Sequence, residues 1–183
     1  MRLRHDQVLT APIELVWSNV TDLCRVGQCF PGARVTSVQG DDFVGVIRTT
    51  LGPLVLTFDG VGSVTHRDDT ARRIAIAADG HQRRGPGRAT LAVEVTLTAV
   101  TEDRTSAHMH TTLQVGGLPA QLGEGIAQRA SDPLVERFLT GMGQEAPCDD
   151  EGPQDQPLDI GRDIVSGLLS SYGRSARALL GRR

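Results

Sequence analysis

Residues 91–115 read LAVEVTLTAVTEDRTSAHMHTTLQV, and this stretch decides the fold. Apolar side chains predominate at every second position from Leu91 to Leu97, and again from Ala107 to Val115. Small or polar side chains occupy most of the positions between them. Because successive side chains of a strand point to opposite faces, this period of two predicts strands of an antiparallel sheet with one apolar and one polar face.

The same period of two extends over the whole region from Ala33 to Gly116. Turn-forming residues interrupt it at Gly40-Asp41-Asp42, at Gly52-Pro53, at Asp68-Asp69 and from Gly80 to Gly87. The segments between these interruptions are each long enough for one strand. We therefore expect an antiparallel meander, in which each strand pairs with the next one along the chain.

Helical periodicity is present on both sides of these strands. Apolar side chains recur at intervals of three and four between Ile13 and Val20, which predicts a short amphipathic helix. After the strands, apolar side chains step by four from Leu118 onwards, and this spacing predicts one long helix that ends near Met142. Pro133 lies inside that helix and is expected to kink it or to split it in two.

The C-terminal part of the chain differs in composition from the rest. Residues 144–157 contain five acids, three prolines and no basic residue. Such a segment cannot bury enough apolar surface to offset the entropy of ordering, so we predict a disordered acidic linker. Residues 158–183 return to a helical period, with arginines crowded towards their end. We predict that they form an amphipathic basic tail helix, which the flexible linker joins to the domain.

Three locations compete for this tail helix: its own domain, a groove of a partner protein, or the surface of an anionic membrane. The acidic linker argues against a tight return to the domain. Basic residues beside an apolar stripe favour anionic lipid. The residues expected to contact the membrane are Ile160, Ile164, Leu168, Leu169, Tyr172, Arg174, Arg177, Leu179, Leu180, Arg182 and Arg183.

Composition argues against several classes of protein. A net charge of −3 leaves no basic surplus for binding nucleic acid. The N-terminus turns polar at once, and no apolar run reaches the roughly 18 residues of a membrane span, so neither a signal peptide nor a spanning helix is expected. The three cysteines match no common zinc spacing, and we expect reduced thiols in a cytoplasmic protein without a metal site.

These elements match the helix-grip fold, an α+β fold. It has a curved antiparallel sheet, short helices after the first strand and a long C-terminal helix. The sheet wraps around the long helix and leaves a cavity between them. Four motifs sharpen this expectation: Ala11-Pro12 with Val16-Trp17, Cys29-Phe30-Pro31-Gly32, Leu51-Gly52-Pro53 with Phe58-Asp59-Gly60, and Val115-Gly116-Gly117 with Gln121-Leu122-Gly123. Over residues 3–142, their order and spacing resemble the carbon monoxide dehydrogenase G-subunit family, within the START-like SRPBCC superfamily. We therefore expect a helix-grip ligand-binding domain over residues 1–143.

This resemblance implies an accessory protein that is not an enzyme and has no catalytic residues. It implies a link between a molybdenum-containing carbon monoxide dehydrogenase, or a related molybdenum hydroxylase, and the inner face of the cytoplasmic membrane. It also implies that the cavity carries a lipophilic small molecule, a respiratory quinone such as menaquinone or ubiquinone, that accepts the electrons of the enzyme. No covalent cofactor is implied.

The cavity would be lined by the apolar faces of the strands and of the long helix. The residues expected to line it are Phe30, Phe43, Ile47, Thr49, Leu56, Phe58, Leu91, Val93, Met109, Leu113, Leu122, Ile126 and Ala130. Thr49, Thr111 and Gln121 are candidates for hydrogen bonds to a ring carbonyl of the ligand. Periodicity does not distinguish a hollow core from a filled one, so the alternative is a pure membrane-anchoring adaptor of the same enzyme without a ligand.

Other polar residues carry weaker signals. His108 and His110 share one face of a strand, as a pair of metal ligands would, but without a third ligand nearby a solvated face is favoured. Arg83, Arg84 and Arg88 are either solvated or in contact with an acidic partner. A cyclase-like or hydrolase-like enzyme is less favoured, because the sequence contains no nucleophile elbow or comparable motif.

Overall fold

A computed structural model describes residues 1–51, 54–116, 124–145 and 158–159 of the chain. Within these residues, two short helices, a run of six strands and one long helix follow one another along the chain, as the sequence predicts. Their bounds are β1 Arg2–Leu9, α1 Ile13–Thr21, α2 Leu23–Cys29, β2 Ala33–Gln39, β3 Asp42–Leu51, β4 Leu54–Asp68, β5 Arg73–Gln82, β6 Arg88–Thr101, β7 Arg104–Val115, α3 Glu124–Met142 and β8 Leu158–Asp159.

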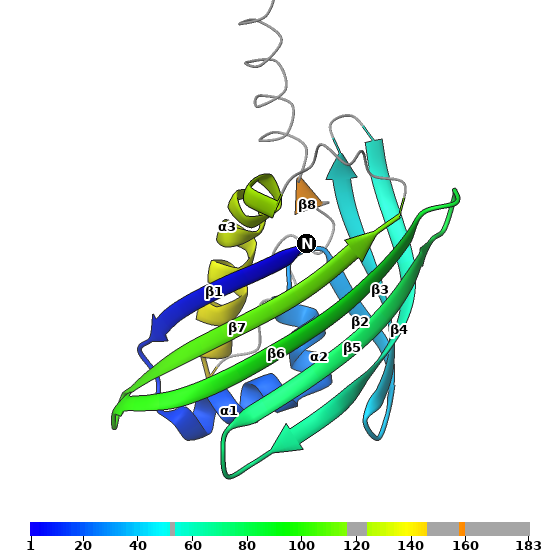
Figure 1. Ribbon diagram of the computed structural model, residues 1–183. Helices are drawn as coiled ribbons and strands as arrows, with labels where there is room; N and C mark the ends of the chain where they lie inside the picture. The colour runs from blue at the N-terminus through cyan, green and yellow to red at the C-terminus, as the bar shows by residue number, and fades with distance from the viewer. Residues whose placement is uncertain (52–53, 117–123, 146–157, 160–183) are drawn as a thin grey trace, which may run out of the picture.

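The sheet is the meander that the sequence predicts, with one addition. Its strands follow the order β1-β7-β6-β5-β4-β3-β2, and all of these neighbours are antiparallel. The N-terminal strand β1 pairs with the last strand of the meander, so that Leu3 stands opposite Thr111. The sheet is curved, and the three helices lie on its inner side (Figure 1). The predicted α+β helix-grip fold is confirmed.

The strand register determines which side chains share the inner face. Ile74, Val95 and Met109 stand opposite one another in a row across β5, β6 and β7. All three are buried in one core with Leu139 and Met142 of α3, whose side chains are fully buried. Full burial of an apolar side chain of this size stabilises a fold by about 1.5–3 kcal/mol. The predicted apolar face of the sheet is therefore the one that packs against the helices.

Trp17 of α1 holds the turn between β4 and β5. Its indole ring is buried, and the Nε1–H group donates a hydrogen bond to Asp69 Oδ1 at 2.9 Å. The guanidinium groups of Arg67 and Arg72 lie 5.9 Å and 5.6 Å from the ring centroid, within cation–π distance. Arg72 has a φ of 51°, and its guanidinium also pairs with Glu14 of α1 at 2.5 Å. These contacts attach α1 to one end of the sheet.

Helix α2 carries two of the three cysteines. Its N-cap, Asp22, accepts hydrogen bonds from the backbone N–H groups of Cys24 at 2.9 Å and Arg25 at 3.2 Å, which satisfies groups that a helix start leaves unpaired. Cys24 is free and exposed, whereas Cys29 is buried and disulfide-bonded. The expectation that all three thiols are reduced is therefore wrong for Cys29, because spacing along the chain does not reveal which cysteines approach each other in space.

Helix α3 is continuous across Pro133, so the predicted possibility of a split helix is wrong. Proline removes one backbone N–H group and crowds the preceding turn. Pro133 is exposed, but Ala130 before it and Val135 after it are both buried, and this packing on either side keeps one helix. Neither α3 nor any other helix within the described residues is long and apolar enough to span a membrane.

Asn19 of α1 caps the C-terminal end of α3. The last carbonyl groups of a helix have no partner within it. The buried Asn19 Nδ2 group donates to the carbonyl oxygen of Met142 at 2.8 Å and to that of Gln144 at 3.1 Å. This contact connects the end of the last helix to the first helix of the chain.

The short strand β8 pairs in parallel with residues 49–50 of β3. Strand β2 pairs with β3 only as far as Ile47, so the edge of β3 beyond that residue is available to another extended segment. We expected Leu158–Asp159 to begin the tail helix at a distance from the domain; instead these residues form a strand against it. Residues 160–183, which contain all the predicted membrane contacts, and most of the predicted linker lie outside the described residues.

Candidate functional site

Most of the residues predicted to line the cavity share the inner face of the sheet. On β3, β4, β6 and β7, these are Phe43, Ile47, Thr49, Leu56, Phe58, Leu91, Val93, Met109 and Leu113. Phe30 follows α2 and its ring lies 5.6 Å from that of Phe138, while Ala130 is buried on α3. Leu122, Gln121 and the side chain of Ile126 lie outside the described part of the chain. The predicted set is thus gathered on one face, and its contact with a ligand stays a prediction.

The inner face divides into two halves that differ in how far they are covered. The packed half consists of Ile74, Val95, Leu97, Ala107 and Met109, all of them buried. The accessible half consists of Phe43, Ile47, Leu56, Leu91 and Leu113, all of them partly exposed. Among the described residues, the core that includes side chains of α1 and α3 contains the packed half and not the accessible half.

A row of residues without bulky side chains crosses the accessible half. This glycine row consists of Gly45, Gly60, Gly80 and Ala89, which stand opposite one another on β3, β4, β5 and β6. A Cβ atom added at Gly80 would find its nearest neighbours on the adjacent strands, at 3.6–3.9 Å. Glycine weakens the interior of a strand and often marks a place where a ligand or another backbone approaches closely. These four positions therefore form a strip of the inner face without bulky side chains, and we interpret this strip as a trough.

His5 is a buried polar residue that we did not single out from the sequence. It lies on β1 opposite Met109 and is 9% exposed. Its Nε2 atom lies 3.1 Å from Ser131 Oγ and 3.3 Å from Asp132 Oδ1 on α3, whereas its Nδ1 atom is buried and has no hydrogen-bond partner among the described residues. Burial lowers the pKa of His5, although the carboxylates of Asp132 and Asp6 act to raise it. Its inner position could have been found from the sequence, because Leu3 and His5 alternate with the charged residues Arg2, Arg4 and Asp6.

Thr111, a predicted hydrogen-bonding residue, is also buried, at 7% exposed, and within the described part of the chain its Oγ1 atom has no hydrogen-bond partner. His5 pairs with Met109, and Thr111 lies two residues further along β7, so His5 and Thr111 are diagonal neighbours on the inner face. Thr49, the other described candidate of this kind, is buried on β3. Since buried polar atoms are nearly always hydrogen-bonded in folded proteins, the two unpartnered atoms require a physical reason.

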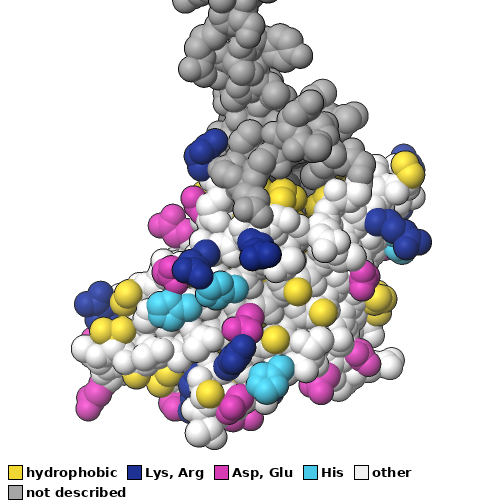
Figure 2. Space-filling model, in the orientation of Figure 1, with side chains coloured by type: hydrophobic (Ala, Val, Ile, Leu, Met, Phe, Trp, Pro, Cys, Tyr) yellow, Lys and Arg dark blue, Asp and Glu magenta, His cyan; other side chains and the backbone are white. Residues whose placement is uncertain are grey.

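On the outer face of the sheet, acidic, basic and histidine side chains are interspersed with single hydrophobic ones (Figure 2). His108 Nδ1 lies 2.6 Å from Asp6 Oδ1, and this hydrogen bond lowers the pKa of the Asp6 carboxyl. His110 stands opposite Glu94, which binds Arg73 at 2.6 Å. Within the described residues, no group of three or more His, Cys, Asp and Glu side chains is arranged to hold a metal ion.

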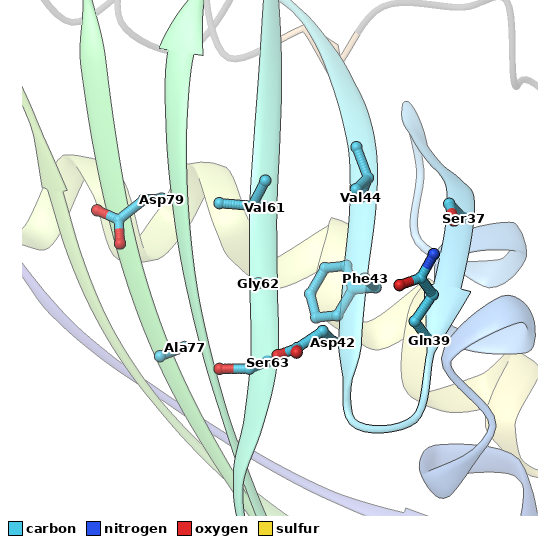
Figure 3. A pocket seen from close by; sticks show the side chains of 10 residues that line it. All are labelled: Ser37, Gln39, Asp42, Phe43, Val44, Val61, Gly62, Ser63, Ala77 and Asp79. Carbon is cyan, nitrogen blue, oxygen red and sulfur yellow. The ribbon is translucent and has the colours of Figure 1, made fainter.

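A hollow of about 360 Å³ lies on the outer side of β2–β5 (Figure 3). Polar and apolar side chains line it together, among them Val44, Val61 and Asp79. Val44 and Val61 are 45% and 59% exposed, so the hollow is open to solvent. Its position outside the sheet separates it from the predicted cavity, although Phe43 borders it from the inner side.

The arginine-rich connection between β5 and β6 is partly tied to the domain. Arg83 donates from Nε and from a terminal nitrogen to the two carboxylate oxygens of Asp59, at 2.9 Å and 2.5 Å. This pairing lowers the pKa of Asp59. Arg84 and Arg88 are exposed. Contact of this connection with an acidic partner therefore depends on Arg84 and Arg88, because the guanidinium of Arg83 is already engaged.

Comparison with protein families gives one assignment for the chain. The model of the CoxG family, described as the G-subunit of carbon monoxide dehydrogenase, matches residues 7–146. This range begins within β1, after Leu3 and His5, and ends after α3, so it includes the inner face of β2 to β7. No curated protein is significantly similar to the chain in sequence.

Solved structures share the fold at low sequence identity. A conserved protein from Geobacillus kaustophilus has a TM-score of 0.68 at 18% identity, over 79% of this chain and 94% of that one. A START superfamily protein from Mycobacterium smegmatis has a TM-score of 0.57 at 12% identity, over 78% and 96%. The Zhui aromatase/cyclase from Streptomyces sp. R1128 has a TM-score of 0.51 at 15% identity, over 78% and 90%. At these identities, the likeness shows the helix-grip architecture alone.

Proposed function

Because the chain belongs to the CoxG family of carbon monoxide dehydrogenase, we propose that it is an accessory protein that carries a respiratory quinone, menaquinone or ubiquinone, on the accessible half of its inner face. In this role it recruits a carbon monoxide dehydrogenase-like molybdenum enzyme to the cytoplasmic membrane. The quinone accepts the electrons that leave the enzyme. The protein delivers this ligand and catalyses no reaction.

The observation that supports a carried ligand is the glycine row beside partly exposed apolar side chains. Leu91 and Leu113 stand opposite each other, and both are partly exposed on the face that elsewhere forms the core. Covering such surface with a lipophilic chain is favourable by about 0.8 kcal/mol for each buried CH₂ group. A few isoprene units would therefore hold a ligand with few polar contacts, because the trough leaves room for the chain against the backbone of the sheet.

Mass spectrometry of a solvent extract tests this function. The full-length protein is purified without detergent, extracted with organic solvent, and the extract is compared with that of an unrelated protein purified in the same way. We expect a quinone enriched in proportion to the protein. The absence of any enriched lipid, together with no binding of added quinone, would contradict the carrier function.

A pure adaptor is the second candidate, and the packed half of the inner face favours it. Val16 of α1 and both Leu139 and Met142 of α3 have no exposed surface, so this part of the core is filled by protein alone. An adaptor would recruit the same enzyme with no ligand. If the protein is such an adaptor, its extract should contain no quinone, and it should still associate with the enzyme.

Membrane recruitment is proposed on the composition of residues 158–183, in which arginines follow an apolar stripe. Each arginine near an anionic surface contributes about 1 kcal/mol to binding. We expect the full-length protein to float with anionic vesicles, and to lose this binding when Arg174, Arg177, Arg182 and Arg183 are all replaced by Glu. The matched control replaces Arg83, Arg84 and Arg88 in the domain by Glu. Flotation that is equal in all three proteins would refute the tail as the membrane anchor.

A further inference from the structure

Two buried polar atoms on neighbouring strands of the inner face have no hydrogen-bond partner in the part of the chain that the structure describes. His5 Nδ1 and Thr111 Oγ1 belong to residues that are more than nine-tenths buried, on adjacent strands β1 and β7. Diagonal neighbours on two paired strands are about 7–8 Å apart, and their Cβ atoms are somewhat closer. A buried polar atom without a partner destabilises the folded protein, so a group that binds both atoms would stabilise it.

The surrounding hydrogen bonds determine where the His5 ring carries its hydrogen. Gln128 Oε1 accepts from the backbone N–H of Arg4 at 3.0 Å, which orients the amide. The amide hydrogens go to Arg4 O at 2.8 Å and Asp132 Oδ1 at 2.7 Å, although Gln128 Nε2 also lies 3.1 Å from His5 Nε2. The Ser131 hydroxyl donates to Gln128 O at 2.9 Å, so it can only accept from His5. His5 Nε2 therefore carries the hydrogen, and the neutral ring has a free lone pair on Nδ1.

The pair lies at the border between the packed half and the accessible half. Thr111 stands opposite Val93, and the next inner position of β7 is Leu113 of the accessible half. From Thr111 to Val115, which is opposite Ala89 of the glycine row, β7 extends by about 13 Å. An apolar chain lying along the accessible half therefore spans the distance from the glycine row to the two unpartnered atoms.

We propose that His5 and Thr111 bind the polar end of the ligand, and that His5 Nδ1 accepts a hydrogen bond from a hydroxyl group of that ligand. This inference rests on the proposed function, because it takes the inner face as the site of a lipophilic molecule. Both atoms are closed off from solvent, so the hydroxyl reaches them by displacing the apolar side chains around them. The Thr111 hydroxyl then binds a second oxygen of the same ring or the same hydroxyl group.

The proposal identifies the chemical class of ligand that the site prefers. A hydroquinone has the hydroxyl hydrogen that His5 Nδ1 can accept. The corresponding quinone has carbonyl oxygens only, and the dimethyl ether of the hydroquinone has ether oxygens only, so both leave Nδ1 without a partner. The site should therefore distinguish the reduced ring from these two forms, although all three cover the same apolar surface.

Calorimetric titration under anaerobic conditions tests this preference on the full-length protein after removal of bound lipid. The probes are a benzohydroquinone with a decyl chain, its oxidised quinone, and its dimethyl ether. We expect the hydroquinone to bind about tenfold more tightly than either other probe, as one buried hydrogen bond would give.

Substitutions at the two residues locate the effect. The variant His5→Phe removes the acceptor, and we expect the three probes to bind it equally. The variant Thr111→Val keeps the shape of the side chain, and we expect a smaller preference for the hydroquinone. Ser131→Ala removes one partner of His5 Nε2 and leaves Nδ1 in place, so the preference should remain; this variant separates a loss of the acceptor from a disturbed contact with α3.

Matched controls lie on the outer face of β7. His110→Phe and Thr112→Val repeat the two substitutions on exposed side chains, and both should bind the probes as the wild type does. A preference that survives His5→Phe would overturn the assignment to His5. Equal binding of the three probes by the wild type would overturn this inference and leave the proposed function intact, whereas no binding of any probe would overturn both.

Discussion

The packed half and the accessible half of the inner face meet on β6 and β7 and share the same alternation of apolar side chains, yet they differ in burial. Ile74 and Leu97 of the packed half are 2% and 3% exposed, in one core with α1 and α3. In the accessible half Leu91 and Leu113 are partly exposed, beside the glycine row. The difference shows that alternation determines which face points inwards, and that the side chains opposite that face determine how far it is covered.

The largest expected effect is a loss of stability confined to the packed half. Leu139→Ala removes a fully buried side chain and should lower the free energy of unfolding by about 2–5 kcal/mol. Leu113→Ala removes a partly exposed one and should lower it by about 1 kcal/mol. Urea denaturation of the two variants measures both values. Equal losses of stability would mean that the two halves are equally packed, contrary to the difference in burial between them.

A smaller effect is expected where α1 closes the packed half over the end of α3. Asn19→Ala leaves the carbonyl oxygens of Met142 and Gln144 without their side-chain donor, and should lower the free energy of unfolding by about 1–3 kcal/mol. Ser18→Ala, at the neighbouring exposed position, is the control. Binding of the decyl probes should not change in either variant, since Asn19 caps α3 on the side of the packed half. A loss of probe binding in Asn19→Ala would show that ligand binding in the accessible half depends on the packing of the packed half.

As the pH falls, protonation of His5, at the border between the two halves, should lower the stability of the protein before the surface carboxyl groups do. Burial lowers the pKa of His5, so between that pKa and its ordinary value of 6.5 the unfolded chain binds a proton that the folded protein does not. Stability is therefore complete above pH 6.5 and falls as the pH decreases below it. The pKa values of Asp6 and Glu94 are also lowered, from 3.8 and 4.5, so these two carboxyl groups reduce stability only at more acidic pH.

Denaturation curves at a series of pH values check this expectation. The variant His5→Phe should lose less stability than the wild type as the pH falls from 6.5 towards about 5. Parallel losses in the two proteins would show that another group is responsible.

The smallest effect is expected on the outer face. Val61 is 59% exposed, and Val61→Thr should change the free energy of unfolding by less than about 0.5 kcal/mol. Its thermal midpoint should equal that of the wild type in a calorimetric scan. A clear destabilisation would indicate that the outer hollow is part of the packed structure of the domain.

The sequence predicts much of this architecture, because side-chain periods report directly on faces. The alternation from Leu91 to Val115 predicts the strands and their inner face, and the step of four predicts α3. The continuity of α3 at Pro133 was not predictable in the same way, since it depends on the burial of Ala130 and Val135 against other elements.

The candidate site was less predictable. Gly45, Gly60 and Gly80 are distant in sequence, and only the register of four strands aligns them with Ala89. The unpartnered atom of His5 likewise depends on α3, whose side chains engage Nε2 and leave Nδ1 alone. Such features arise from tertiary contacts, about which the local periods contain no information.

If a ligand lies in the trough of the glycine row, a side chain that fills this trough should exclude it. Gly80 has no positive φ, so Gly80→Leu places a side chain on the inner face without backbone strain, whereas Ala77→Leu places one on the outer face of the same strand. We expect calorimetric titration with the decyl hydroquinone to show at least about tenfold weaker binding for Gly80→Leu and unchanged binding for Ala77→Leu. Unchanged binding by a folded Gly80→Leu protein would contradict the account.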